Sequence, residues 1–165
     1  MKNILILVFF ATMLSCKEDT ESKNKAQAKS IEQYSIEQFM NNEAVSGGSF
    51  SPDNSKLLIS SNRSGIFNAY TVPTTGGEYT QITASDSISY FAVSYFPNDE
   101  RMLLSADGNG DEIDHIYMRN TNGEIKDLTP EQGAKSSFYG WSADKNSFYF
   151  GSNKRDARYF DVYKM

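Results

Sequence analysis

The stretch FSPDNSKLLISSN, residues 50–62, places an aromatic residue before a Ser-Pro-Asp turn and then an apolar run. Proline fixes φ, and an Asp side chain can hydrogen-bond its own backbone, so Pro52 and Asp53 favour a tight turn. The run Leu57, Leu58 and Ile59 favours a short buried strand. If this turn-and-strand unit recurs along the chain, the fold is an array of similar units.

The unit recurs twice, at a period of 45 to 46 residues. YFPNDERMLLSAD (residues 95–107) and WSADKNSFYFGSN (residues 141–153) align with the first copy without a gap, and Asn62, Asp107 and Asn153 close the three expected strands. Further on, TTGGEYTQIT (residues 74–83) matches NTNGEIKDLT (residues 120–129). A fixed period of this size, filled with four short strands, is typical of a propeller blade.

The sequence therefore predicts an all-β fold, an incomplete β-propeller of four-stranded antiparallel blades. Two full blades are expected at about residues 44–84 and 90–130, and most of a third at 136–165. Blades stack because one sheet cannot bury both of its faces alone. A β-sandwich with look-alike strands is the alternative, which three aligned copies disfavour. Since propellers close with about four to eight blades, we expect either a fragment with an exposed sheet edge or closure by oligomerisation.

Composition agrees with short strands and limits the partners. The chain has ten Tyr and eleven Phe among 165 residues, and its formal net charge is −5. No long block of Lys and Arg is present, so a nucleic acid is not an expected partner.

The N-terminus reads MKNILILVFFATMLSC, a basic start followed by a short apolar run and a single Cys. This pattern predicts export, and its end resembles the lipobox of bacterial lipoproteins, in which the Cys is lipidated. Met13 stands where that motif prefers Leu, and an ordinary signal peptide is the alternative. We expect a lipoprotein signal peptide at residues 1–15, lipid attachment at Cys16, a flexible tether at 16–33 and a cell-envelope location, on the periplasmic face or the outer-membrane surface. Two Ser-x-x-Gln patterns in SIEQYSIEQF, residues 30–39, predict a short helical turn.

The blade sequences resemble a known family. The Phe-Ser-Pro-Asp turn, SSNRSGIFNAY (residues 60–70), SNKRDARYFDVY (residues 152–163) and DGNGDEIDHIYMRNTNGEIKDLTP (residues 107–130) resemble the propeller of the prolyl oligopeptidase family of serine peptidases. The likeness is to bacterial members of the acylaminoacyl- and dipeptidyl-peptidase type and covers residues 34–165. The blade turn also resembles that of TolB-like periplasmic propellers.

The peptidase resemblance implies a propeller that gates peptide substrates, with an α/β-hydrolase domain downstream as its partner. That domain is absent from these 165 residues. The alternative is a non-enzymatic TolB-like envelope propeller that binds proteins or glycans. The only membrane contact that we expect is the lipid anchor.

We expect no catalytic, cofactor-binding or metal-binding residue in the chain. GWSAD, residues 140–144, begins like a nucleophile elbow, but Asp144 replaces the second Gly and Ser142 falls on the blade turn. His115 is the only His, and its place in the repeat matches Asn68 and Asp161, which predicts a strand-end hydrogen bonder.

A calcium loop is a further candidate in DGNGDEID, residues 107–114. Asp107, Asn109 and Asp111 fit its start, but Glu112 stands at the sixth place and Met118 at the twelfth, where such a loop needs Gly and a bidentate Glu. We therefore expect a turn between two strands there.

Replacing Cys16 with Ala should move the protein from the membrane pellet to the soluble fraction, because the lipid would have no attachment point. Membrane fractionation measures this, with Ser22→Ala in the expected tether as the control. Unchanged membrane retention of Cys16→Ala would point to another mode of attachment.

Overall fold

The computed structural model describes residues 31–108 and 110–165. The expected signal peptide, Cys16 and the tether up to residue 30 lie outside the described residues. All strands in the described residues belong to one compact unit, Met40–Met165. Within the two described ranges, no helix has the length and apolar character to cross a bilayer.

A short helix, α2 (Ile36–Met40), forms at the second Ser-x-x-Gln pattern. The Ser35 amide donates to Gln38 Oε1 at 2.8 Å, and the Gln38 amide donates to Ser35 Oγ at 3.3 Å. The two residues thus satisfy each other's exposed amides, which is a capping box. The predicted helical turn is confirmed at this pattern, while Ser30 of the first pattern lies outside the described residues.

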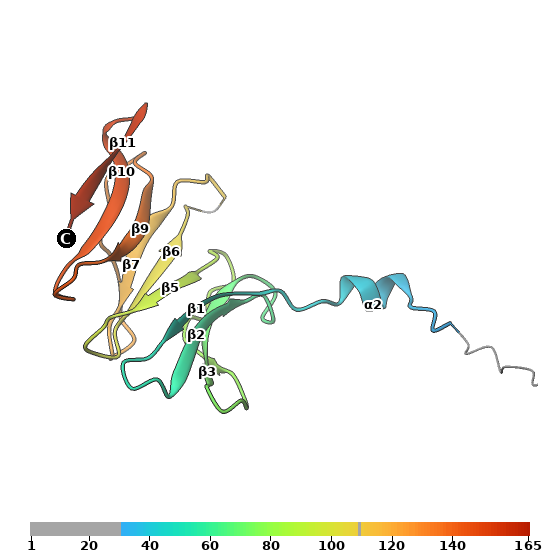
Figure 1. Cartoon of the computed structure of the whole chain (residues 1–165). Coiled ribbons are helices and arrows are strands. Elements are labelled where there is room, and N and C mark those ends of the chain that lie inside the picture. Colours follow the sequence, from blue (N-terminus) through green and yellow to red (C-terminus); the bar gives the residue numbers. More distant parts are fainter. Residues whose placement is uncertain (1–30, 109) are drawn as a thin grey trace, which may run out of the picture. The chain divides into compact units, whose positions relative to one another are not determined.

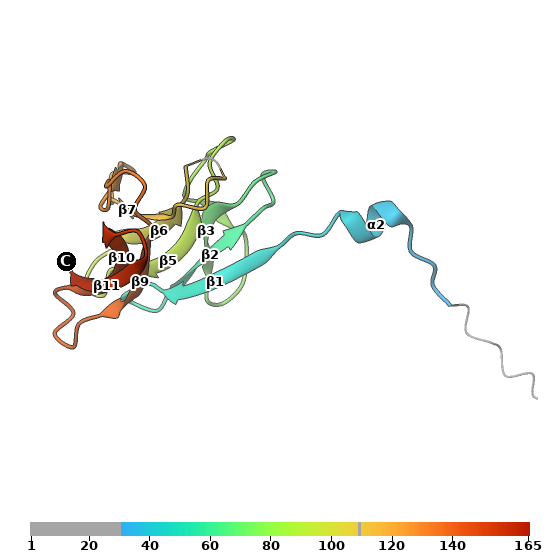
Figure 2. The same ribbon diagram turned by 90° about the horizontal axis from the view of Figure 1, so that it is seen from above.

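Three antiparallel sheets follow one another along the chain and stand side by side (Figures 1 and 2). Blade 1 has the order β1-β2-β3-β4, blade 2 the order β5-β6-β7-β8, and blade 3 has three strands, β9-β10-β11. The strands are β1 (Val45–Phe50), β2 (Lys56–Ser61), β3 (Asn68–Pro73), β4 (Thr80–Gln81), β5 (Phe91–Tyr95), β6 (Met102–Ala106), β7 (His115–Arg119), β8 (Ile125–Asp127), β9 (Ser136–Trp141), β10 (Phe148–Asp156) and β11 (Tyr159–Lys164). The prediction of an all-β, incomplete propeller is confirmed.

The first strand of every blade ends at the predicted aromatic residue, which is Phe50, Tyr95 or Trp141. Each of these strands also carries a register irregularity one to four residues before that aromatic. A bulge bends a strand and increases its twist. The repeat therefore extends to a structural detail that the sequence alignment did not predict.

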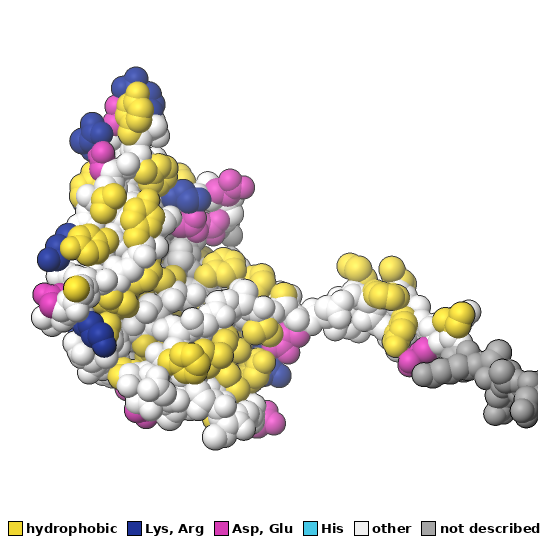
Figure 3. All heavy atoms as spheres, viewed as in Figure 1, with side chains coloured by type: hydrophobic (Ala, Val, Ile, Leu, Met, Phe, Trp, Pro, Cys, Tyr) yellow, Lys and Arg dark blue, Asp and Glu magenta, His cyan; other side chains and the backbone are white. Residues whose placement is uncertain are grey.

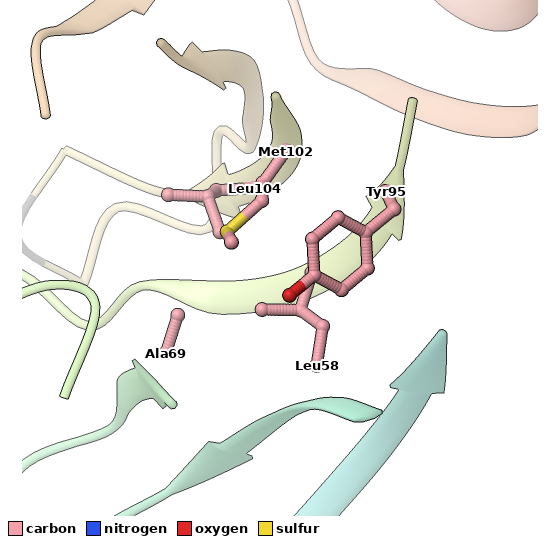
Figure 4. Packing of buried hydrophobic residues seen from close by; sticks show 5 residues of the cluster. All are labelled: Leu58, Ala69, Tyr95, Met102 and Leu104. Atoms are coloured by element: carbon pink, nitrogen blue, oxygen red, sulfur yellow. The ribbon is translucent and has the colours of Figure 1, made fainter. Parts of the chain in front are cut away.

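Two separate hydrophobic clusters fill the two gaps between blades. Leu58 and Ala69 of blade 1 pack with Tyr95, Met102 and Leu104 of blade 2 (Figure 4). A second cluster joins blades 2 and 3 and contains Leu103, Ile116, Phe148 and Phe150. Consecutive strand residues point to opposite faces, so the neighbours Leu103 and Leu104 serve different clusters. Blade 2 is covered on both faces, as predicted for a stacked blade.

Backbone hydrogen bonds also join the blades at equivalent places. The Tyr90 amide donates to the Phe67 carbonyl at 2.9 Å, and the Ser136 amide donates to the Asp114 carbonyl at 2.7 Å. In both cases the chain entering the first strand of one blade meets the chain entering the third strand of the preceding blade. The apolar contact and the backbone hydrogen bond together fix the position of each blade relative to the preceding blade.

A buried threonine holds the fourth strand in each complete blade. Thr83 Oγ1 accepts the Ala69 amide at 2.9 Å, and Thr129 Oγ1 accepts the Ile116 amide at 2.9 Å. Both threonines are almost fully buried. The short strands β4 and β8 are thus extended by a side-chain contact to the backbone of the third strand.

The end of β10 differs from the expectation. The strand was expected to close at Asn153, but it runs on to Asp156 and joins β11 through Ala157 and Arg158. The amide of Arg158 donates to Asp156 Oδ1 at 3.0 Å, and Arg155 Nη2 donates to Asp161 Oδ1 at 2.9 Å across the hairpin. These contacts support a two-residue connection where blades 1 and 2 have longer loops.

Thr129→Val should lower the free energy of unfolding by about 1–3 kcal/mol, because the Ile116 amide would stay buried without an acceptor. Chemical denaturation measures the change. Thr121→Val, the same substitution at an exposed loop position, is the matched control. Equal stability of the two variants would contradict the role of the buried hydroxyl.

Candidate functional site: the turn face

The turns that follow the first strands of the three blades line one hollow. This hollow has a volume of about 350 Å³, and we call the surface around it the turn face. Residues from all three blades line it: Ser49, Phe50, Ser51, Pro52, Asn54, Ser94, Tyr95, Phe96, Pro97, Trp141 and Lys145. The array therefore brings together three turns that lie far apart in the sequence.

The turns of blades 1 and 3 each contain the same pattern of hydrogen bonds between a serine and an aspartate. Ser51 Oγ donates to Asp53 Oδ1 at 2.6 Å, and the Lys56 amide donates to Ser51 Oγ at 3.0 Å. The hydroxyl of Ser51, with the Ser55 amide and hydroxyl, lowers the pKa of Asp53 to about 2. Asn54 and Lys145 take the left-handed backbone conformation at the same place, with φ of 58° and 59°.

Ser142 fills the same structural role in blade 3. Its hydroxyl donates to Asp144 Oδ1 at 2.5 Å and accepts from the Ser147 amide at 3.1 Å. This hydrogen bond and the Asn146 amide hold the pKa of Asp144 below its usual value. Ser142 is a buried turn residue, the position expected from its alignment with Ser51.

The middle turn departs from this pattern. Phe96 replaces the serine, and Asp99 binds Arg101 through two pairs of atoms, with Nε–Oδ1 and Nη2–Oδ2 distances of 2.9 Å and 2.8 Å. This side-chain contact holds the pKa of Asp99 below its usual value. The Arg101 guanidinium carbon also lies 4.2 Å from the centre of the Phe96 ring. An aromatic ring and an ion pair therefore stand together between blades 2 and 3.

A second hollow, of about 320 Å³, opens between blades 2 and 3 beside the first. The two hollows share Phe96, Pro97, Trp141 and Lys145, and we call them together the Trp141 groove. The residues that line only the second hollow are Asn98, Asp99, Arg101, Met118, Leu128, Asn146, Ser147, Phe148 and Met165. The groove combines an apolar floor with the ion pair of Asp99 and Arg101 and with the cationic side chain of Lys145, which suits a ligand that has both apolar and anionic groups.

Trp141 is held firmly at the junction of the two hollows. Its Nε1 donates to Ser94 Oγ at 2.9 Å, and its ring centre lies 4.9 Å from that of Phe96. Phe138 and Phe148 pack against the same indole. The sequence predicted Trp141 only as the end of a strand. The sequence feature that could have indicated the groove is Phe96, which stands where the other two blades have a serine and which contacts Arg101.

His115 lies away from this groove, at the start of β7. Its Nδ1 lies 2.7 Å from Asp127 Oδ2 on the adjacent strand β8. At the equivalent place in blade 1, Asn68 Nδ2 donates to the Ser85 carbonyl at 2.9 Å. The contact is of the kind expected for a strand-end hydrogen bonder.

The acidic loop before β7 is held by hydrogen bonds that its backbone amides donate to its own Asp side chains. Asp111 Oδ1 accepts the amides of Gly108 and Ile113 at 3.1 Å and 2.9 Å, and Asp107 Oδ2 accepts the Glu112 amide at 3.3 Å. Asn109 lies outside the described residues. Among the described residues, no group of three or more His, Cys, Asp and Glu side chains is placed to hold a metal ion. The described residues of this loop are thus held by hydrogen bonds between backbone amides and the Asp107 and Asp111 side chains.

Comparison with solved structures gives the class of fold. The chain resembles the crystal structure of TolB from Acinetobacter baumannii, with a TM-score of 0.59, 21% identity, and coverage of 74% of this chain and 29% of that protein. It also resembles the structure of putative TolB from Agrobacterium tumefaciens, with a TM-score of 0.58, 22% identity, and coverage of 72% and 41%. The chain thus has a TolB-like propeller fold and spans less than half of either protein.

No protein-family model and no curated protein matches the chain. The likeness to the solved structures therefore shows the fold alone.

Proposed function

We propose that the protein is a non-enzymatic envelope propeller that binds an extended peptide segment of another protein in the Trp141 groove. The observation that carries this proposal is the groove itself, where Phe96 and Trp141 form an aromatic floor and Lys145 adds a positive charge, while Arg101 is paired with Asp99. Binding sites of this size are mostly apolar, with a few polar groups that set the orientation of the ligand. The TolB-like fold supports an envelope propeller in general terms.

The groove suits a peptide with an apolar side chain next to a carboxylate. The apolar side chain would lie on the indole of Trp141, and Lys145 would meet the carboxylate. Lys145 is exposed, and its position is fixed by the turn, whose backbone is held by Ser142 and Asp144. A charge-assisted hydrogen bond on such a rigid support contributes more than one from a mobile loop.

Export and lipid attachment at Cys16 remain part of the proposal. An anchored propeller would hold its groove close to an envelope surface, where it could meet other envelope proteins. Glycans are the alternative class of ligand. The positive charge of Lys145 favours an acidic peptide over a neutral glycan.

A peptidase-gating role is a second candidate. It is favoured by the segment at residues 107–130, whose sequence resembles the prolyl oligopeptidase propellers. A Gly-x-Ser-x-Gly segment encoded downstream in the same reading frame would support this candidate, and the propeller would then gate a hydrolase. If the downstream sequence instead encodes a separate protein of another class, the peptidase-gating candidate would be ruled out.

Pentapeptides that place Leu or Phe next to Asp should bind and change the fluorescence of Trp141, the only Trp in the chain. Lys145→Gln should weaken binding of the Asp peptides about tenfold, or ~1.4 kcal/mol, because a charge-assisted contact is lost. Lys126→Gln, at an exposed strand position, is the control and should leave the affinity unchanged.

Peptides with Lys in place of Asp should bind more weakly and be insensitive to Lys145→Gln. Two outcomes would contradict the proposal. One is the absence of any Trp141 response to the peptides, and the other is a neutral oligosaccharide that binds better than every peptide.

A further inference from the structure

A third hollow lies between blades 1 and 2, apart from the two hollows of the Trp141 groove. It has a volume of about 300 Å³, and it is lined by Thr71 and Ile82 of blade 1 and by Tyr95, Met102 and Arg119 of blade 2, among others. We call it the Tyr95 hollow. Sites for small ligands have volumes of about 300–1,000 Å³, so this hollow suits a ligand at the small end of that range.

The Tyr95 hydroxyl is a buried donor that lacks an acceptor. Tyr95 and Trp141 end the first strands of their blades and so occupy the same place in the repeat. Trp141 Nε1 donates to Ser94 Oγ at 2.9 Å. The side chain of Tyr95 is 2% exposed, and its hydroxyl has no hydrogen-bond partner among the described residues. Buried polar groups are almost always hydrogen-bonded, so this hydroxyl indicates the place of a ligand oxygen.

The position of this hydroxyl relates it to the hollow. It points toward Leu58 of blade 1 (Figure 4), and Leu58 pairs in the sheet with Thr71, which lines the hollow. Burial raises the pKa of Tyr95 to about 12, and the charge of Glu100, another lining residue, adds to the rise. The hydroxyl therefore stays protonated near neutral pH and can donate a hydrogen bond.

Arg119 gives the hollow a positive charge. On the face seen in Figure 3, lysine and arginine side chains are scattered, and several lie beside Asp or Glu side chains. Arg119 instead donates to two backbone oxygens, from Nε to the Ile82 carbonyl at 3.1 Å and from Nη1 to the Asn120 carbonyl at 3.4 Å. The other charged lining residues, Lys56 and Glu100, pair with each other at 3.3 Å. The charges of the lining residues thus sum to the one positive charge of Arg119.

We propose that the Tyr95 hollow is a second binding site, which takes a small monocarboxylate with a short apolar chain. The carboxylate would pair with the Arg119 guanidinium and accept the hydrogen bond of the Tyr95 hydroxyl, while the apolar chain would lie on Ile82 and Met102. A guanidinium fits a carboxylate geometrically, and one that is already held by backbone oxygens loses little freedom on binding. A single positive charge favours a monoanion over a doubly charged phosphate. This proposal does not depend on what the Trp141 groove binds.

Calorimetric titration of the full chain with hexanoate, in a mild non-ionic detergent, tests the proposal. Hexanoate should bind with a Kd of about 1 mM or lower, the affinity of a well-matched ligand with few atoms. Hexanamide, its neutral analogue, should bind about tenfold more weakly, and Arg119→Gln should weaken hexanoate binding by about the same factor, because each change removes a charge-assisted contact. Arg158→Gln, at an exposed arginine in the connection between β10 and β11, is the matched control and should leave the affinity unchanged.

Tyr95→Phe separates binding from folding. The hydroxyl has no partner in the free protein, so its removal should not lower the melting temperature. Hexanoate should nevertheless bind several-fold more weakly to this variant, because the ligand loses a hydrogen-bond donor.

Four results would overturn the proposal. They are the absence of hexanoate binding, equal binding of hexanamide, tighter binding of butyl phosphate than of hexanoate, and an unchanged affinity in Tyr95→Phe. The Trp141 fluorescence identifies binding at the other site, because Trp141 does not line the Tyr95 hollow. A response of Trp141 to hexanoate, with no effect of Arg119→Gln on the affinity, would place the ligand in the Trp141 groove and would also contradict the proposal.

Discussion

The structure depends on the burial of apolar sheet faces between neighbouring blades. A four-stranded sheet with residues such as Leu103 and Leu104 on its central strand has two apolar faces, and neither can be left in water at low cost. Leu104 is buried against blade 1, and Leu103 against blade 3. This packing fixes the spacing of the blades, and through it the spacing of the turns that form the Trp141 groove.

Much of this fold could be predicted from the sequence because the determinants are local and repeated. The aromatic residue, the turn and the apolar strand follow each other within thirteen residues, so the ends of β1, β5 and β9 were predicted correctly. Gly123, in the stretch that matches residues 74–83, has φ of 92°, which only Gly adopts readily. The overrun of β10 was not predicted, because it depends on contacts such as Arg155 with Asp161 that have no counterpart in the other blades.

The Trp141 groove could not be predicted from the repeat for a related reason. Alignment of the copies emphasises what they share, whereas the groove is built where they differ. Phe96 replaces a serine that hydrogen-bonds the turn in the other blades, and the ring is then free to stack under Arg101. The contact of Trp141 with Ser94 joins residues 47 positions apart, and its geometry depends on how two blades pack. The residues that the three copies share form the propeller scaffold, and residues that differ between the copies form the groove.

The most direct test of the account is a pair of double-mutant cycles on residues that are neighbours in sequence but face different blades. Leu58→Ala combined with Leu104→Ala removes two side chains of one cluster, whereas Leu58→Ala combined with Leu103→Ala removes side chains of two clusters. Each single change should cost about 2–5 kcal/mol of unfolding free energy. The account predicts a coupling energy of at least about 0.5 kcal/mol between Leu58 and Leu104, and additive effects for Leu58 and Leu103. Coupling of Leu58 to Leu103 with none to Leu104 would contradict the assignment of the two faces, and with it the stacked-blade fold.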